Sequence, residues 1–96
     1  MRKYEIMYIV RPTLSEEELA AVVKKFNEVL TSNDAKVVNV TEIGQKELAY
    51  EIKKFRSGYY YVIDVEAEND KAIKEFDRLA LINPDIIRHL ITNKED

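Results

Sequence analysis

The sequence predicts one α+β domain over residues 1–96, in which two helices cover one face of a four-stranded antiparallel sheet. Segments with the two-residue period of strands alternate with segments that have the period of a helix, in the order β-α-β-β-α-β. This order is typical of a split β-α-β fold, which leaves the other face of the sheet open. The length of 96 residues, with 46% hydrophobic and 34% charged residues, fits a single domain of this class.

The first strand is expected over Tyr4–Val10, a run rich in β-branched and aromatic residues whose even positions are all large and apolar or aromatic. A helix should follow from Ser15, because the Ser15 side chain can cap the free amides while Glu18 completes a capping box. Apolar residues at helical spacing continue to Leu30, and the polar run 31–34 ends the helix.

Residues 36–53 are expected to form a long strand or a bent pair of strands, because Gly44 lies where a bulge or bend is expected. In the second half of this segment Leu48, Tyr50 and Ile52 alternate with Glu or Ala. This alternation predicts that these three side chains form the buried side of the strand.

A turn at 54–58 should lead into a third strand over Tyr59–Ala67, whose odd positions are expected to be buried. The second helix should begin after residues 69–70 and stop at 83–85, and the last strand is expected from Ile86 to Thr92. The strand order in the sheet is expected to be 4-1-3-2. One core is expected, formed by Ile6, Tyr8, Val23, Phe26, Leu48, Ile63, Phe76 and Leu79.

The composition excludes several kinds of chemistry. The absence of cysteine excludes disulfides, thiol catalysis and cysteine-based metal sites. His89 is the only histidine, and its parity with Ile87 and Ile91 favours a place under the sheet over catalysis. The two glycines, Gly44 and Gly58, cannot supply a phosphate-cradling loop. We therefore expect a protein that is not an enzyme, with no metal site, no cofactor and no small-molecule substrate.

The charge is weakly acidic, because 15 basic and 18 acidic residues give a net charge of −3. A free-standing nucleic-acid binder usually carries a basic surplus. Residues 1–57 hold ten Lys or Arg against nine Asp or Glu, whereas residues 58–96 hold five against nine, so any polyanion contact should come mainly from the first half. No apolar run reaches the ~20 residues of a membrane span. A cytoplasmic protein without membrane association is expected.

Two alternatives concern the tyrosines and the open face. The third strand is similar to the aromatic motif of RNA-recognition domains, but alternation leaves only Tyr60 on the open face, so aromatic strand packing is favoured. Apolar residues of adjacent strands are expected to form a patch on that face, which suggests a protein partner. The patch consists of Met7, Ile9, Tyr60, Val62 and Leu90.

The decapeptide Gly44–Lys53 (GQKELAYEIK) resembles the signature of the family of bacterial small-subunit ribosomal protein six. The opening Met1–Glu5, the pair 11–12 and the pair 87–88 are similar to that family too, and the resemblance covers the whole chain. It implies a ferredoxin-like fold and a structural, ribosome-associated role in the small subunit. Family members bind the central domain of 16S ribosomal RNA as a heterodimer with a small basic protein, number eighteen of the same subunit.

The resemblance directs attention to basic residues near strand ends and the second hairpin as contacts to RNA phosphates. They are Arg2, Lys3, Lys46, Lys53, Lys54, Arg56 and Arg88. Among them, Arg2 and Arg88 are expected to converge on one backbone segment. The alternative function is a small ferredoxin-like ligand-binding or regulatory domain, which would keep an apolar or anion pocket in its loops.

Overall fold

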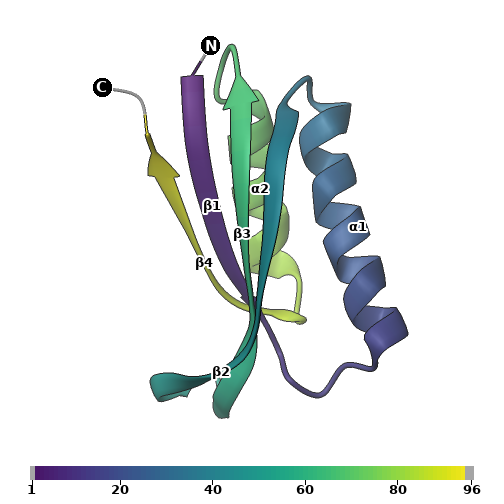
Figure 1. Ribbon diagram of the computed structural model, residues 1–96, viewed down its shortest axis with the longest axis vertical. Coiled ribbons are helices and arrows are strands. Elements are labelled where there is room, and N and C mark those ends of the chain that lie inside the picture. The colour runs from purple at the N-terminus through teal and green to yellow at the C-terminus, as the bar shows by residue number, and fades with distance from the viewer. Residues whose placement is uncertain (1, 95–96) are drawn as a thin grey trace.

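The computed structural model describes residues 2–94 and places two helices on one face of a four-stranded sheet (Figure 1). The elements are β1 (Arg2–Val10), α1 (Glu16–Ser32), β2 (Lys36–Ile52), β3 (Phe55–Ala67), α2 (Lys71–Ile82) and β4 (Ile86–Asn93). The sheet order is β2-β3-β1-β4, and all neighbouring strands are antiparallel. Read from the other edge, this is the predicted order 4-1-3-2, so the predicted fold class is confirmed.

The pairing of β1 with its neighbours decides which side chains share a face. Tyr8 lies opposite Tyr61 of β3 and His89 of β4, and these three side chains point toward the helices. One position earlier, Met7 lies opposite Val62, and their side chains point to the open face because successive residues alternate across a strand. The predicted parity of β1 and β3 is therefore confirmed.

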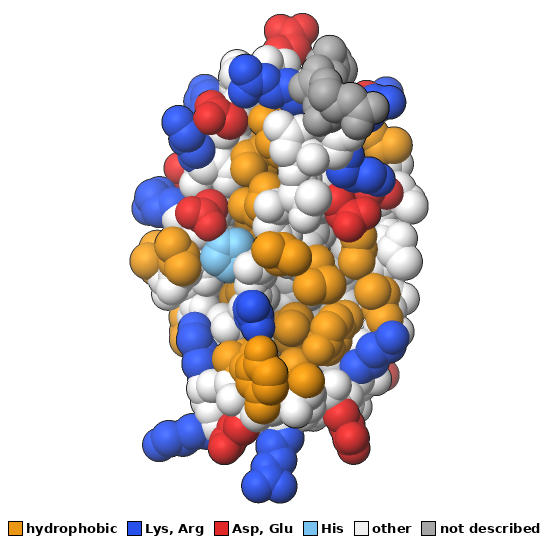
Figure 2. All heavy atoms as spheres, turned by 90° about the vertical axis from the view of Figure 1, so that its left-hand side faces the viewer, with side chains coloured by type: hydrophobic (Ala, Val, Ile, Leu, Met, Phe, Trp, Pro, Cys, Tyr) orange, Lys and Arg blue, Asp and Glu red, His pale blue; other side chains and the backbone are white. Residues whose placement is uncertain are grey.

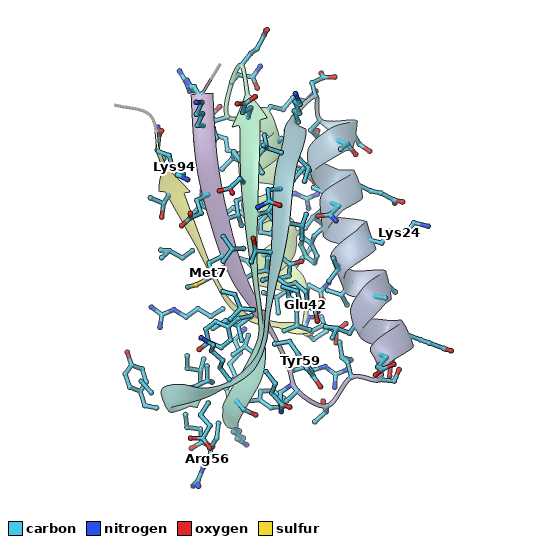
Figure 3. All side chains as sticks on the ribbon, viewed as in Figure 1. Met7, Lys24, Glu42, Arg56, Tyr59 and Lys94 are labelled. Carbon is cyan, nitrogen blue, oxygen red and sulfur yellow. The ribbon has the colours of Figure 1, made fainter. Side chains whose placement is uncertain are left out.

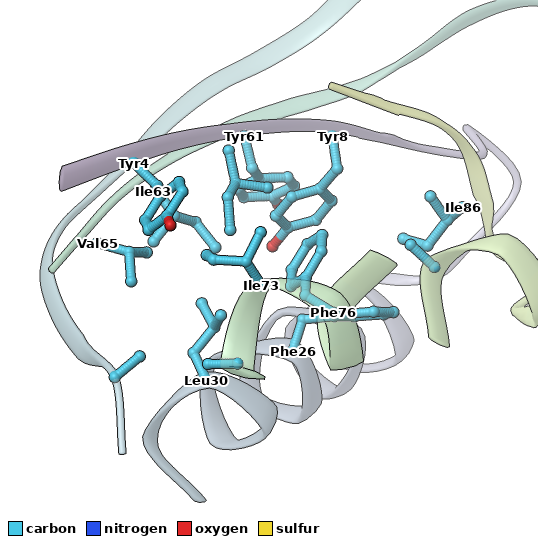
Figure 4. Close-up of a cluster of buried hydrophobic side chains, with 14 of the residues drawn as sticks. Tyr4, Tyr8, Phe26, Leu30, Tyr61, Ile63, Val65, Ile73, Phe76 and Ile86 are labelled. Atoms are coloured by element: carbon cyan, nitrogen blue, oxygen red, sulfur yellow. The ribbon is translucent and has the colours of Figure 1, made fainter. Parts of the chain in front are cut away.

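The core lies between the sheet and the helices, and aromatic rings fill its centre (Figure 4). The Tyr8 ring stacks on Tyr61 at 5.4 Å between centroids, and it lies 6.0 Å from Phe26 and 5.8 Å from Phe76. Burial raises the pKa of the Tyr8 phenol far above its ordinary value. Of the eight residues predicted for the core, seven lie in it or pack against it: Ile6, Tyr8, Phe26, Ile63 and Phe76 are fully buried, and Val23 and Leu79 are partly buried.

A bulge in β2 changes which of its residues face the core. Glu42 lies opposite Tyr61, whereas Gly44 lies opposite Tyr60, so Ile43 is an extra residue in the ladder. A shift of one residue moves every later side chain to the other face of the strand. Gly44 has a φ of +98°, a conformation that glycine adopts at little cost.

The prediction that Leu48, Tyr50 and Ile52 form a buried side in the main core is therefore wrong. Leu48 and Ile52 are half-buried on the open face, and Tyr50 is 69% exposed. The last part of β2 and the first part of β3 form a two-stranded extension, residues 44–60, which we call the arm. In Figure 1 the arm curves away from the helices toward the open face.

The tip of the arm is a two-residue turn formed by Lys53 and Lys54, because Ile52 pairs with Phe55. The predicted turn at 54–58 is therefore wrong, and β3 begins four residues earlier than expected, at Phe55. Both lysines adopt a positive φ, 50° and 71°, which closes the hairpin without glycine.

Gly58 lies one residue beyond the last pair of β1 and β3, Val10 with Tyr59, where the arm comes close to the end of β1. A Cβ at this position would overlap the side chain of Ile9 and approach the carbonyl oxygen of Val10 to 3.0 Å. Only glycine fits such a close approach without displacing a neighbour.

Two polar arrangements fix the loops at the ends of the elements. The capping box predicted for α1 is confirmed, since Ser15 Oγ accepts from the Glu18 amide and Glu18 Oε1 accepts from the Ser15 amide. Arg11 joins the loop before α1 to the loop before β4, because its Nε donates to Asp85 Oδ1 at 2.7 Å and its backbone N–H donates to the Asp85 carbonyl at 2.9 Å.

Candidate protein and RNA interface

The apolar patch predicted on the open face consists of residues that the structure brings together. Met7 lies opposite Val62 of β3 and Leu90 of β4, and Ile9 lies opposite Tyr60. Leu90 is 54% exposed, whereas the neighbouring arm leaves Ile9 only 3% exposed. Figure 2 views this face and shows hydrophobic side chains gathered over its lower half.

Residues of the arm turn this patch into a pocket. The pocket has a volume of about 170 Å³, and Leu48, Ala49, Tyr50 and Ile52 line it. The other lining residues are Met7, Ile9, Tyr60, Arg88 and Leu90. Pockets for small molecules usually measure about 300–1,000 Å³, so this one suits a single side chain of a protein partner better than a metabolite.

Sequence reasoning missed the contribution of the arm because it placed the alternating residues of β2 on the wrong face. The signal that could have found them was Gly44, at which a bulge was expected. A bulge at this position moves Leu48 to the face of Met7 and Tyr60. Tyr50 and Ile52 line the same pocket beyond a further shift in the ladder, between Glu47 and Ile52.

The upper half of the open face is charged rather than apolar. Glu5 lies directly opposite Asp64, and Lys94 Nζ lies 3.7 Å and 3.5 Å from their carboxylate oxygens. Like charges in directly opposite positions repel each other, and the lysine offsets that repulsion. In Figure 3 the side chains of Lys94 and Met7 extend from the sheet on the same side, whereas Glu42 lies on the side of α1. The apolar patch therefore has a charged border on one side.

The basic residues predicted to bind RNA lie in three places. Arg2 and Lys3 start β1 at one end of the sheet, and Arg88 lies on the open face opposite Ile9. The other four belong to the arm: Lys46, Lys53, Lys54 and Arg56. With the acidic Glu47 and Glu51, the described arm residues carry four positive and two negative side chains, a net charge of +2.

The expectation that Arg2 and Arg88 converge is wrong. Arg2 lies opposite Ala67 and shares the parity of the core residue Tyr4, whereas Arg88 lies opposite Ile9 on the other face. The part of β1 between Arg2 and Ile9 spans roughly 23 Å at the rise of an antiparallel strand. The two guanidinium groups therefore lie near different ends of the sheet.

Arg88 instead lies close to the tip of the arm. Lys53 and Arg88 both line a depression of about 260 Å³ beside the end of α2. The rest of its described lining is Ala80, Leu81, Ile86, Ile87 and His89. Arg56 lines a different depression on the arm, together with Glu47 and Glu51.

His89 lies beneath the sheet as predicted. Its Nε2 is 2.6 Å from Asp77 Oδ1 of α2, its ring lies 6.4 Å from that of Phe76, and its side chain is 13% exposed. Ile87 does not share this face, because it is the extra residue where the β1–β4 ladder shifts between Arg88 and Ile86. Among residues 2–94, no three His, Asp or Glu side chains come together as a metal site would require.

A larger groove separates α1 from β2 on the helix side of the sheet. It has a volume of about 710 Å³, and half-buried apolar residues such as Leu19, Val23 and Val37 form much of its lining. Its charged lining residues are Glu16, Lys24, Glu28 and Glu42. This excess of carboxylates makes the groove unsuitable for an anionic ligand. The groove also lies between a helix and a strand, whereas the alternative function would keep its pocket in the loops.

No helix within residues 2–94 combines the length and the apolar character needed to cross a membrane. A sheet face that is uncovered, apolar and bordered by charges is typical of a surface that contacts another macromolecule. The fold and the site thus define a class, a small split β-α-β domain whose open sheet face carries an apolar patch with a charged border.

Comparison with known proteins identifies the family within this class. A family model described as ribosomal protein S6 matches residues 3–93. The crystal structure of 30S ribosomal protein S6 from Thermotoga maritima is similar to this structure with a TM-score of 0.92 and 31% sequence identity, over 97% of this chain and 87% of the other. The chain belongs to the ribosomal protein S6 family.

Membership confirms the resemblance found in the sequence and the ferredoxin-like fold that it implied. It assigns the chain a structural, RNA-binding role in the small ribosomal subunit and, with it, association with the ribosome.

Proposed function

We propose that this chain binds the central domain of 16S ribosomal RNA together with protein eighteen of the small subunit, with which it forms a heterodimer. The observation that carries the proposal is the apolar pocket in the open face, bordered by a basic arm on a chain whose net charge is −3. The pocket supplies a surface for a protein, and the arm supplies a local positive charge for RNA.

The protein partner docks on the patch formed by Met7, Ile9, Tyr60, Val62 and Leu90, extended by the arm residues that line the pocket. Apolar side chains at the centre of such a surface contribute most of the binding free energy, because their burial removes them from water. A basic companion also compensates the negative charge of this chain, because it supplies the cations that this chain lacks for binding RNA phosphates.

The RNA is held by phosphate contacts that position the protein without reading sequence. The candidate contacts are Arg2, Lys3, Lys46, Lys53, Lys54, Arg56 and Arg88. Because few of them can reach one RNA segment, the chain alone binds RNA weakly, and it binds tightly only as part of the heterodimer. The chain has no catalytic role in this proposal, requires no cofactor and acts in the cytoplasm.

The docking surface is tested with exposed positions, so that the fold is retained. Leu90→Asp and Tyr50→Asp place a charge on side chains that are 54% and 69% exposed, whereas Ile9→Asp would disturb a buried residue. The matched control is Ile82→Asp, at a 66% exposed position at the end of α2. Titration calorimetry with purified protein eighteen should show at least a tenfold loss of affinity for both open-face variants, about 1.4 kcal/mol, and none for the control. Unchanged affinity for both would place the interface elsewhere.

The RNA role is tested by titrating a central-domain RNA fragment with this chain, with protein eighteen, and with both. The proposal requires that the mixture binds at least ten times more tightly than either protein alone. Tight binding by this chain alone, with a steep dependence on salt, would contradict it.

A further inference from the structure

The turn at the tip of the arm uses residues that its geometry disfavours. Lys53 and Lys54 are the two central residues of a hairpin turn, and both have a positive φ. Two-residue turns of this type prefer Asn-Gly or Asp-Gly, because a side chain in the left-handed region crowds the following carbonyl oxygen. Two lysines are therefore unfavourable residues for closing this hairpin.

The depression that Lys53 lines has a second cation in its described lining. Lys53 lies in the turn between β2 and β3, and Arg88 lies in β4, yet both line one depression of about 260 Å³. None of its described lining residues is acidic, since the others are four apolar residues and His89. Arg56 differs in this respect, because two glutamates line its depression.

The sign of the charge decides which partner this region faces. Lys53 and Arg88 line one depression, and Lys54 follows Lys53 in the turn. Cations gathered in this way repel a basic protein and attract a polyanion. The apolar pocket, by contrast, is lined by uncharged residues apart from Arg88, which lies between the two regions and lines both depressions. The arm therefore presents an apolar side to the companion and its charged tip to the nucleic acid.

We infer that Lys53, Lys54 and Arg88 form a contact site for the phosphates of the RNA backbone. This inference rests on the proposed function and selects three of the seven candidate residues. The turn keeps its disfavoured conformation because both of its side chains bind RNA, in line with the occurrence of strained backbone at functional sites.

The test replaces the turn with the residues that its geometry prefers. Lys53→Asn combined with Lys54→Gly removes both charges and should raise the melting temperature, so a loss of binding cannot be attributed to unfolding. Arg88→Gln is examined separately. The matched control, Lys24→Gln combined with Lys25→Gln, removes two exposed charges from α1.

Each complex with protein eighteen is titrated with the central-domain RNA fragment over a series of salt concentrations. The slope of log K against log salt should fall in magnitude by about two for the turn variant and by about one for Arg88→Gln, and should not change for the control. Each phosphate contact raises the association constant about tenfold when the salt concentration falls from ~1 M to ~0.1 M. The turn variant lacks two contacts, so at ~0.1 M salt it should bind the RNA about 100-fold more weakly.

The possible failures are distinguishable. If the wild-type complex binds the RNA and the turn variant has the same slope and affinity, the inferred site is wrong while the proposed function stands. If the turn variant instead loses affinity for protein eighteen in the absence of RNA, the tip contacts protein and the inference is also wrong. If the wild-type complex does not bind the RNA, both fail.

Discussion

The hydroxyl of Tyr8 provides a sharp test of the core. It is buried without a hydrogen-bond partner among the described residues, in a side chain with no exposed surface. Burying a hydroxyl without a partner costs about 1–3 kcal/mol in proteins. Tyr8→Phe removes this cost and also removes the few dispersion contacts of one oxygen atom, at roughly 0.1–0.2 kcal/mol each. We therefore expect the free energy of unfolding to rise by about 1 kcal/mol, which corresponds to a melting temperature roughly 5 °C higher for a domain of this size.

The same substitution changes how stability depends on alkaline pH. Burial raises the pKa values of Tyr8 and Tyr61 in the folded protein, so the unfolded chain releases these phenolic protons first as the pH passes ~10. The folded state then loses stability by about 1.4 kcal/mol per pH unit for each such group until its own pKa is reached. Tyr8→Phe should remove the Tyr8 contribution and leave that of Tyr61.

Urea denaturation at neutral pH and at several values above pH 10 measures both effects. The control is Tyr50→Phe, because the Tyr50 side chain is 69% exposed and its hydroxyl is hydrated in both states. A Tyr8→Phe variant that is less stable than the wild type at neutral pH, or that keeps the wild-type alkaline slope, would refute the assignment of an unsatisfied hydroxyl.

Three further predictions concern packing and loops, and each is measured by urea or thermal denaturation. Gly58→Ala should cost about 1–3 kcal/mol, because the added methyl overlaps β1; an unchanged melting temperature would mean that the arm moves freely. Phe26→Ala should cost about 3–5 kcal/mol, whereas Leu48→Ala, on the open face, should cost less than about 1 kcal/mol, and equal losses would contradict the assigned faces. Arg11→Ala should cost about 1 kcal/mol at moderate salt, since its pair with Asp85 is only half-buried, and no loss would show that the loops hold without it.

The sequence predicted the fold where local signals and packing agree. The alternation in β1, the capping box at Ser15 and the apolar stripe of α1 each indicate an element without reference to the rest of the chain, and all three are present. The patch around Met7 was predicted for the same reason, since the alternation of β1 and β3 continues without interruption where they pair.

The errors arose where the conformation at one backbone position decides on which face the following side chains lie. The extra residue at Ile43 reversed the face of Leu48, and a further shift in the ladder follows between Glu47 and Ile52. Gly44 signals the bulge but does not show how the later residues pair. The turn was misplaced because Ser57 and Gly58 are typical turn residues, whereas two lysines with positive φ are not. The position of Arg88 and Lys53 on one depression could not be predicted, because it depends on the curvature of the arm.

The irregular ladder of β2 has a consequence for the solubility of the free chain. β2 is a long edge strand, and Val38, Val40 and Ile43 are 53%, 38% and 39% exposed on it. A straight edge with such residues would be a template on which further copies could add as strands, the first step of aggregation. The ladder shifts between Val37 and Asn39 and again between Glu42 and Gly44, so the free N–H and C=O groups do not form a continuous row. The bulge that directs the arm thus also makes the edge of β2 a poorer template for the edge-to-edge pairing of two chains.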